Sequence, residues 1–117
     1  MEQYREPIEA ADTVACNDVA TSLLAVTEYG TARNVKVEGH AIAGKTGTAE
    51  YVNNEGKYET KNYITSFVGW LANTNSNLVC LVIISKPESD IDGGAACGPV
   101  FADIMNFAAE RYNIVNK

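Results

Sequence analysis

The chain has 117 residues, 15 of them acidic and 9 basic, and a formal net charge of −6, which allows one domain at most and argues against nucleic acid or an anionic membrane as a charge-driven partner. The longest unbroken apolar run, Leu78 to Ile84, has seven residues, whereas about twenty are needed to cross a bilayer. The polar start of the sequence also lacks the apolar core of a signal peptide, so we expect any anchor or signal to lie outside it.

The three cysteines and the single histidine do not form a metal-binding or disulfide pattern. Cys16, Cys80 and Cys97 are too few and too far apart for a disulfide framework or a zinc site. Cys80 stands in an apolar run and is predicted to be a buried thiol, and a bridge between Cys80 and Cys97 is left open although no pattern favours it. His40 has no second histidine or cysteine at ligand spacing, so we expect a structural or solvent-exposed role for it. We therefore expect no metal and no cofactor.

The first predicted element is a helix from Thr13 to Tyr29. The residues before it are polar and interrupted by Pro7, which predicts an irregular lead-in. Asp12 is the expected N-cap, although Asp18 would support a later start, and Gly30 stands where a left-handed C-terminal cap would end the helix. The amphipathic pattern comes from apolar residues that recur at steps of three and four, namely Ala15, Val19, Leu23 and Val26.

A strand is predicted from His40 to Glu50. The polar stretch 31–39 before it holds two alternating valines and is a candidate for a short strand of its own. Gly44 and Gly47 within the predicted strand indicate a bulge or a close approach by another backbone or a ligand. The composition Asn53-Asn54-Glu55-Gly56 then predicts a hairpin turn.

Two further strands are predicted from Lys61 to Asn73 and from Asn77 to Lys86, joined by a tight turn as an antiparallel hairpin. Both carry apolar residues at odd and even positions, which indicates strands that are covered on both faces. A helix from Ala95 to Tyr112 follows, and Pro99 is expected in its first turn, where a missing N–H does no harm. The apolar face of this helix comprises Phe101, Ile104, Met105, Ala108 and Tyr112.

The order of helix, three antiparallel strands and helix predicts an α+β fold, with one helix available for each face of the sheet. No internal repeat and no linker divides the chain. Residues 1–117 are therefore expected to belong to a single domain.

The stretch from Ala43 to Glu50 places one cation, two hydroxyls and two glycines close together. Two patterns fit it: residues 39–46 match the phosphate-binding loop G-x-x-x-x-G-K-[ST], and Lys45-Thr46-Gly47 is the K-T-G box of β-lactamases and penicillin-binding proteins. A phosphate loop needs a helix that begins at the Lys-Thr pair, and the segment after Thr46 is too short and broken to form one. The K-T-G pattern is therefore favoured, with a nucleotide-binding protein as the weaker alternative.

A K-T-G strand at the edge of a sheet suits the recognition of a substrate carboxylate. Lys45 offers a fixed positive charge, and Thr46 and Thr48 offer hydroxyls. Gly47 removes the side chain that would block an approaching acyl group, and free backbone N–H groups at the edge can pair with an extended peptide or polarise a carbonyl. Lys45 also has a plainer explanation, since lysines on edge strands discourage aggregation.

Four segments resemble, in the same order, the C-terminal part of the transpeptidase domain of class B penicillin-binding proteins. Residues 24–32 (LAVTEYGTA) are similar to a helix end followed by a G-T-A/G turn, and residues 43–50 (AGKTGTAE) to an A-G-K-T-G-T-A-[EQ] strand. Residues 66–72 (SFVGWLA) resemble an S-F-x-G-x-x-P strand, with Ala72 where the family often has proline. Residues 93–101 (GGAACGPVF) resemble the G-G-x-x-A-A-P-x-F entry to the last helix.

The resemblance implies D,D-transpeptidase chemistry, in which a serine is acylated by a D-Ala-D-Ala stem peptide or by a β-lactam. It implies that Lys45 steadies the hydrogen-bond network and the positive field of the site, and that Thr46, Gly47 and Thr48 bind the substrate. The two threonine hydroxyls would hold its carboxylate, and the backbone N–H of Thr48 would be half of the oxyanion hole. The resemblance also implies peptidoglycan stem peptides and β-lactams as partners and a place at the extracytoplasmic face of the bacterial cell membrane.

The chain departs from the family pattern where the nucleophile is concerned. It has neither an S-x-x-K box nor an S-x-N box, and Tyr51-Val52-Asn53, which imitates a Y-x-N variant, follows the K-T-G box instead of preceding it. We therefore expect residues 1–117 to be a partial domain that supplies the K-T-G strand to a longer protein and is inactive alone. The alternative is a free-standing, non-catalytic module that binds peptides along the Lys45–Glu50 edge. Uncovered strands also predict a homodimer through the exposed sheet edge.

Overall fold

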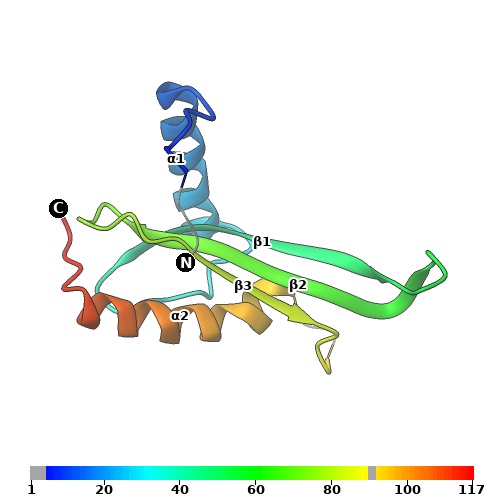
Figure 1. Ribbon diagram of the computed structural model, residues 1–117. Coiled ribbons are helices and arrows are strands. Elements are labelled where there is room, and N and C mark those ends of the chain that lie inside the picture. Colours follow the sequence, from blue (N-terminus) through cyan, green and yellow to red (C-terminus); the bar gives the residue numbers. More distant parts are fainter. Residues whose placement is uncertain (1–4, 90–91) are drawn as a thin grey trace.

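The protein folds as an antiparallel sheet with one helix before it and one after it in the chain (Figure 1). A computed structural model describes residues 5–89 and 92–117. The elements are α1 (Thr13–Tyr29), β1 (Ala41–Val52), β2 (Tyr58–Ala72), β3 (Cys80–Ser85) and α2 (Gly93–Arg111). The strands lie in the order β1-β2-β3, which confirms the predicted α+β fold with its three-stranded antiparallel sheet.

The strands β1 and β2 form a long hairpin that extends past the end of β3 (Figure 1). Their pairing is regular over residues 41–50 of β1, and the register shifts directly after them. The turn at the far end is closed by the backbone N–H of Asn53, which donates to the carbonyl of Lys57 at 2.9 Å. Since the pairing is regular through Gly44 and Gly47, neither glycine marks a bulge, and a close approach is the explanation that remains for them.

The helix α2 lies along one face of the sheet, and the core fills the space between them (Figure 1). Phe67 of β2 and Phe101 of α2 are fully buried, with their ring centroids 4.8 Å apart in an edge-to-face arrangement. Such an aromatic pair contributes about 0.5–1.5 kcal/mol beyond its buried area. The buried cluster around the two rings comprises Ala32, Val35, Val37, Ile42, Leu71, Val82, Cys97, Met105, Ala108 and Ile114.

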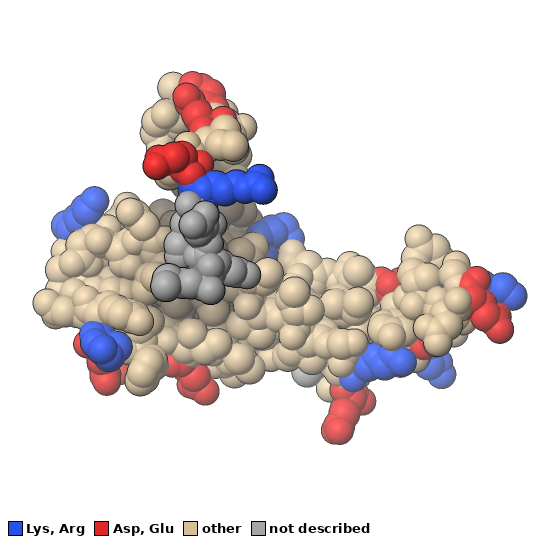
Figure 2. All heavy atoms as spheres, in the orientation of Figure 1, with Lys and Arg blue, Asp and Glu red and all other residues tan. Residues whose placement is uncertain are grey.

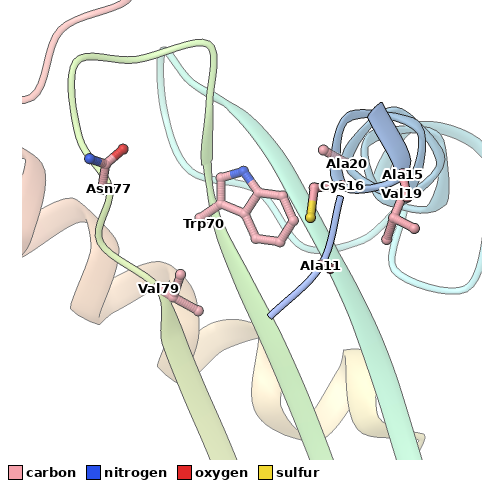
Figure 3. Close-up of a pocket in the computed structure, with 8 residues that line it drawn as sticks. All are labelled: Ala11, Ala15, Cys16, Val19, Ala20, Trp70, Asn77 and Val79. Atoms are coloured by element: carbon pink, nitrogen blue, oxygen red, sulfur yellow. The ribbon is translucent and has the colours of Figure 1, made fainter. Parts of the chain in front are cut away.

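The helix α1 projects from the side of the sheet opposite α2 and contacts β1 near its own C-terminal end (Figure 1). Thr27 is buried there, and its hydroxyl donates to the carbonyl of Ile42 in β1. Val14 and Val19, closer to the start of the helix, are 66% and 56% exposed. An open apolar cavity of about 490 Å³ separates this part of α1 from the sheet (Figure 3), lined by Ala11, Ala15, Cys16, Val19, Ala20, Trp70, Asn77 and Val79. One helix thus lies on each side of the sheet, but α1 covers little of its own.

The strand β3 is shorter and less covered than predicted. It excludes the first residues of the predicted range 77–86, because Thr74 and its neighbours form a hydrogen-bonded loop, with the Thr74 hydroxyl donating to the carbonyl of Leu71 at 3.1 Å. Val82 is 8% exposed under α2, whereas Leu81 and Ile83 on the other face are each 59% exposed. The prediction of cover on both faces is therefore wrong for β3 within the described residues, where α2 covers one face only.

The helix α2 begins earlier than predicted. Asp92 is its N-cap and accepts a hydrogen bond from the backbone N–H of Ala95 at 2.8 Å, so the helix starts at Gly93. Pro99 is consequently the seventh residue of the helix, and the expectation that it falls in the first turn is wrong. Because proline has no N–H, the carbonyl of Ala95 lacks its usual helical partner at this point.

The ends of α1 agree with the prediction in part. Asp12 is the N-cap, as expected, and accepts a hydrogen bond from the N–H of Ala15 at 3.3 Å. Gly30 ends the helix with φ −102° and ψ −150°, so the predicted left-handed cap is wrong, although the Gly30 N–H still donates to the carbonyl of Val26. The stretch 31–39 forms turns and not the short strand considered for it.

The three cysteines and His40 are not arranged as a metal-binding site. Cys16 is exposed, Cys80 half-buried and Cys97 fully buried, and all three are free thiols, so the bridge between Cys80 and Cys97 is not formed. Burial raises the pKa of the Cys80 thiol above its ordinary value. His40 contacts the C-terminal tail, where its Nδ1 lies 3.0 Å from Oδ1 of Asn116, which is a structural contact of the kind expected.

Charged side chains are dispersed over the face of the molecule that Figure 2 shows, and Lys and Arg form no continuous patch there. Among residues 5–89 and 92–117, no cluster of histidine, cysteine and carboxylate side chains is arranged to hold a metal ion. No helix in the same ranges is long and apolar enough to cross a membrane.

Candidate functional site

The K-T-G stretch lies in β1, at an edge of the sheet that no described strand covers (Figure 1). Side chains alternate between the two faces of a strand, so Thr46 and Thr48 share one face while Lys45 and Gly47 belong to the other. Thr46 is paired with Phe67, whose ring packs against α2, and the two threonines therefore lie on the α2 side. The outer N–H and C=O groups of such an edge strand have no strand partner.

The amine of Lys45 turns back toward the threonine side of β1. Its Nζ donates a hydrogen bond to the carbonyl of Thr46 at 2.9 Å and lies 3.5 Å from Oγ1 of the same residue. Lys45 is exposed, and it takes part in none of the ion pairs of the described residues. A positive charge and a hydroxyl therefore stand side by side at the open edge, an arrangement that suits a carboxylate ligand.

The helix α2 starts directly against the K-T-G strand. A Cβ added to Gly93 would lie 2.6 Å from the carbonyl oxygen of Ser66 and 3.0 Å from that of Gly47. A Cβ added to Gly94 would lie 3.5 Å from Cγ2 of Thr46. The glycine pair is therefore what allows the helix to begin at this distance from β1. Both glycines belong to the segment 93–101 that resembles the family, but its sequence does not reveal their close approach to β1.

The turn that follows α1 reaches the same place. Oγ1 of Thr31 lies 3.2 Å from Oγ1 of Thr46, and the carbonyl oxygen of Thr31 would be 3.1 Å from a Cβ on Gly94. The G-T-A turn, the K-T-G strand and the start of α2 thus converge at the edge of the sheet. The sequence analysis missed the contact of Thr31, because nothing in a local pattern signals a hydrogen bond between residues 15 positions apart.

The two glycines of β1 have different neighbours. A Cβ on Gly44 would lie 2.6 Å from Cζ of Phe67 and 2.7 Å from the carbonyl oxygen of Val68, so Gly44 makes room for a core ring. A Cβ on Gly47 would meet only the hydroxyl of Ser66, at 2.6 Å, and otherwise no atom closer than 4.0 Å. Gly44 is therefore required by packing, whereas the space beside Gly47 is limited by one rotatable hydroxyl.

The Tyr51-Val52-Asn53 stretch lies at the far end of the hairpin and serves the turn. Oδ1 of Asn53 accepts hydrogen bonds from the backbone N–H groups of Glu55 at 2.9 Å and of Lys57 at 3.0 Å. This turn-closing role accounts for Asn53 without a second catalytic box.

The backbone excludes the phosphate-loop alternative. The strand β1 continues from Ala41 to Val52, so Lys45 and Thr46 lie within a strand and no helix begins at them. Both strand pairings of the described sheet are antiparallel, whereas a phosphate loop follows a strand of a parallel sheet. The nucleotide-binding interpretation is therefore wrong.

A family model described as the penicillin-binding protein transpeptidase domain matches residues 9–106 of the chain. The chain belongs to this family. The match includes the G-T-A turn, the K-T-G strand and most of α2, and it confirms the resemblance drawn from the sequence motifs.

Relatives of this transpeptidase family are similar over most of the chain. Stage V sporulation protein D of Bacillus subtilis is 40% identical over 85 residues, which cover 72% of the chain and 13% of that protein. The peptidoglycan D,D-transpeptidase FtsI of Buchnera aphidicola is 35% identical over 79 residues, which cover 67% of the chain and 14% of that protein. The chain therefore spans less than one sixth of the length of these relatives.

Solved transpeptidase structures share the fold. Penicillin-binding protein 3 of Mycobacterium tuberculosis, in complex with aztreonam, matches 97% of the chain with a TM-score of 0.77 and 29% identity. The transpeptidase domain of penicillin-binding protein 3 from Burkholderia pseudomallei matches 86% of the chain with a TM-score of 0.71 and 31% identity. The chain covers 28% and 30% of these two solved chains, respectively.

Proposed function

We propose that residues 1–117 are part of the transpeptidase domain of a longer class B penicillin-binding protein that cross-links peptidoglycan. In this proposal the chain is a partial domain, and it supplies the K-T-G wall of the site. The convergence of the G-T-A turn, the K-T-G strand and the start of α2 at an open sheet edge is the observation that carries the proposal. Family membership supports it.

The proposed roles follow from the chemistry of the edge. Lys45 supplies a positive charge and steadies the hydrogen-bond network, and Thr46 and Thr48 donate their hydroxyl protons to the substrate carboxylate. The backbone N–H of Thr48 is half of the oxyanion hole, and Gly47 leaves room for the acyl group. The exposure of Lys45 and Thr48 and the contact of Lys45 Nζ with Thr46 support these assignments.

The proposed partners are peptidoglycan stem peptides and β-lactams, and the proposed location is the extracytoplasmic face of the bacterial cell membrane. The Buchnera relative is named as a peptidoglycan D,D-transpeptidase, and the Mycobacterium protein was solved with aztreonam. The proposed acyl transfer needs a serine Oγ that attacks a carbonyl carbon while the amide bond breaks and its nitrogen takes a proton. None of the serines of this chain precedes a lysine by three positions, so the proposal places the nucleophile elsewhere in the longer protein.

The test is covalent labelling with benzylpenicillin, followed by intact mass. We expect the longer protein to gain the mass of one benzylpenicillin and the 117-residue chain to gain none. Lys45→Ala in the longer protein should slow acylation by about a hundredfold or more, while Lys57→Ala, which changes a lysine of the distant hairpin turn, should leave it unchanged. An unlabelled longer protein would contradict the proposed function, and a labelled 117-residue chain would contradict the missing nucleophile.

For the isolated chain we also propose a homodimer, formed through the free edge of β1 and the uncovered face of the sheet. Leu81 and Ile83 are each 59% exposed on that face, and uncovered edges and apolar faces favour association. Light scattering at high concentration should therefore give twice the monomer mass. The double substitution Leu81→Lys and Ile83→Lys should restore the monomer, whereas Phe107→Lys, a change at an exposed ring of α2, should not. A monomeric wild-type chain would contradict this proposal.

A further inference from the structure

Thr31 is held at the K-T-G strand by its neighbours in the chain. It follows the C-cap of α1 directly, and the next residue, Ala32, is fully buried in the core. The carbonyl of Ala32 accepts a hydrogen bond from the N–H of Val35 at 3.0 Å, which closes the turn. On the other side, the carbonyl of Thr31 packs against Gly94 at the start of α2. The backbone of Thr31 is therefore positioned from both sides, and its hydroxyl lies 3.2 Å from that of Thr46.

The hydrogen bond between the two threonines has two alternative directions with different consequences. A hydroxyl carries one proton to donate and two lone pairs to accept with. The ammonium of Lys45 can only donate, so in its contact with Thr46 Oγ1, at 3.5 Å, the Thr46 oxygen is the acceptor. If Thr46 donated its proton to Thr31, Thr46 would have none left for a ligand. A carboxylate can only accept. A carboxylate that is bound by the Thr46 hydroxyl therefore requires that Thr31 be the donor in the hydrogen bond between the two threonines.

We propose that Thr31 is a positioning residue for Thr46: it donates its hydroxyl proton to Thr46 Oγ1, so that the proton of Thr46 points outward to the substrate carboxylate. This inference rests on the proposed function, in which Thr46 binds that carboxylate. Thr31 itself does not touch the ligand. The Thr31 hydroxyl, the Thr46 hydroxyl and the substrate carboxylate then form a continuous series of hydrogen bonds. Each of these bonds strengthens the next, because successive hydrogen bonds polarise one another.

If the Thr31 hydroxyl had a purely structural role, its removal would lower the folding stability and would leave ligand binding unchanged. The proposal predicts the opposite. The Thr31 side chain is exposed, and its hydrogen bond joins two exposed groups, so removal of the hydroxyl should change the folding stability little. Its removal should instead weaken the binding of a ligand that carries a carboxylate. The acylation step that follows should be unaffected, since Thr31 is not placed to act on the reacting atoms.

The experiment uses the longer protein and benzylpenicillin. The dissociation constant of the complex that precedes acylation and the acylation rate constant are measured separately by stopped-flow kinetics. We expect Thr31→Val to raise the dissociation constant about three- to tenfold with less than a twofold change in the rate constant. Thr31→Ser, which keeps the hydroxyl, should match the wild type. The matched control is Thr21→Val, because the Thr21 hydroxyl donates to the carbonyl of Asn17 on the exposed part of α1.

A double-mutant cycle identifies Thr46 as the group through which Thr31 acts. In a Thr46→Val background, Thr31→Val should have no further effect on the dissociation constant. Thr31→Ala gives the same comparison if the valine variant does not fold. A wild-type protein that does not react with benzylpenicillin at all would refute the proposed function. A reactive wild type with an unchanged dissociation constant in Thr31→Val, or with an effect that persists in the Thr46→Val background, would overturn the role of Thr31 alone.

Discussion

Replacement of Gly44 by alanine tests whether the K-T-G strand is held against the core as described. A Cβ at this position would lie 2.6 Å from Cζ of Phe67, 3.1 Å from its Cε1 and 2.7 Å from the carbonyl oxygen of Val68. Contacts this short require movement, and the ring of Phe67 is fully buried against Phe101. The carbonyl oxygen of Val68 belongs to the paired backbone of β2 and is equally fixed.

The expected cost of Gly44→Ala is therefore that of an overpacked core, about 1–3 kcal/mol of unfolding free energy. For a domain of this size such a loss lowers Tm by roughly 4–15 °C. Urea unfolding monitored by circular dichroism gives the free energy, and the same measurement applies to the chain alone and to the longer protein.

The matched control is Gly47→Ala, three positions along the same strand. Its Cβ would meet only the Ser66 hydroxyl, which can rotate away, and alanine also reduces the conformational entropy of the unfolded chain. We expect Gly47→Ala to change the unfolding free energy by less than about 1 kcal/mol. If Gly44→Ala were as stable as the wild type, or no less stable than Gly47→Ala, the packing of Phe67 over Gly44 would be refuted.

Three further predictions concern the elements that support the site. Asp92→Ala should lower the unfolding free energy by about 1 kcal/mol through loss of the α2 cap. This loss should exceed that of Asp12→Ala, which removes the cap at the exposed start of α1. Equal losses in urea unfolding would contradict the stronger cap at α2. Phe101→Ala should cost about 3–5 kcal/mol, and a loss below about 1 kcal/mol in the same assay would place the core elsewhere. Burial raises the pKa of the Cys80 thiol in the folded chain above its ordinary, unfolded value. Its contribution to stability is thus complete below the unfolded pKa and is lost as the pH rises through the folded pKa. The urea midpoint should consequently fall more steeply above pH 9 in the wild type than in Cys80→Ala, and identical slopes would contradict the prediction.

The sequence predicted the elements whose patterns are local. The helix Thr13–Tyr29 and its cap at Asp12 were predicted, because apolar spacing and capping chemistry act within a few residues. The hairpin turn between β1 and β2 was predicted from the composition of residues 53–56. The motif order also led to the family, because four segments had to agree at once.

The errors arose where distant contacts decide the structure. The loop before β3 is held by the C-terminal tail, where the N–H of Asn75 donates to the carbonyl of Val115 at 3.1 Å, and no local pattern reveals that pairing. Pro99 was expected in the first turn of α2, but Asp92 caps the helix seven residues before the proline, and the helix tolerates the proline in its interior. The apolar pattern of β3 predicts cover on both faces, but Leu81 and Ile83 are exposed, since composition does not reveal which element covers a face.

The site could be predicted only in its parts. Lys45, Thr46 and Thr48 were singled out because their residue types suit a carboxylate, and β1 places them at an edge of the sheet. The approach of Thr31 to Thr46, and of Gly93 to the backbone of Gly47, depends on how α1, β1 and α2 pack together. Tertiary packing of this kind is not encoded in any single segment.

The coding sequence upstream of the codon for Met1 tests the central claim most directly. If this chain is the K-T-G wall of a transpeptidase, the open reading frame should continue upstream into an S-x-N box and, further upstream, an S-x-x-K box. Lys45, Thr46 and Thr48 would then join a complete set of catalytic boxes. A stop codon and a ribosome-binding site directly before Met1 would contradict the claim, and a peptide-binding module would take the place of the transpeptidase.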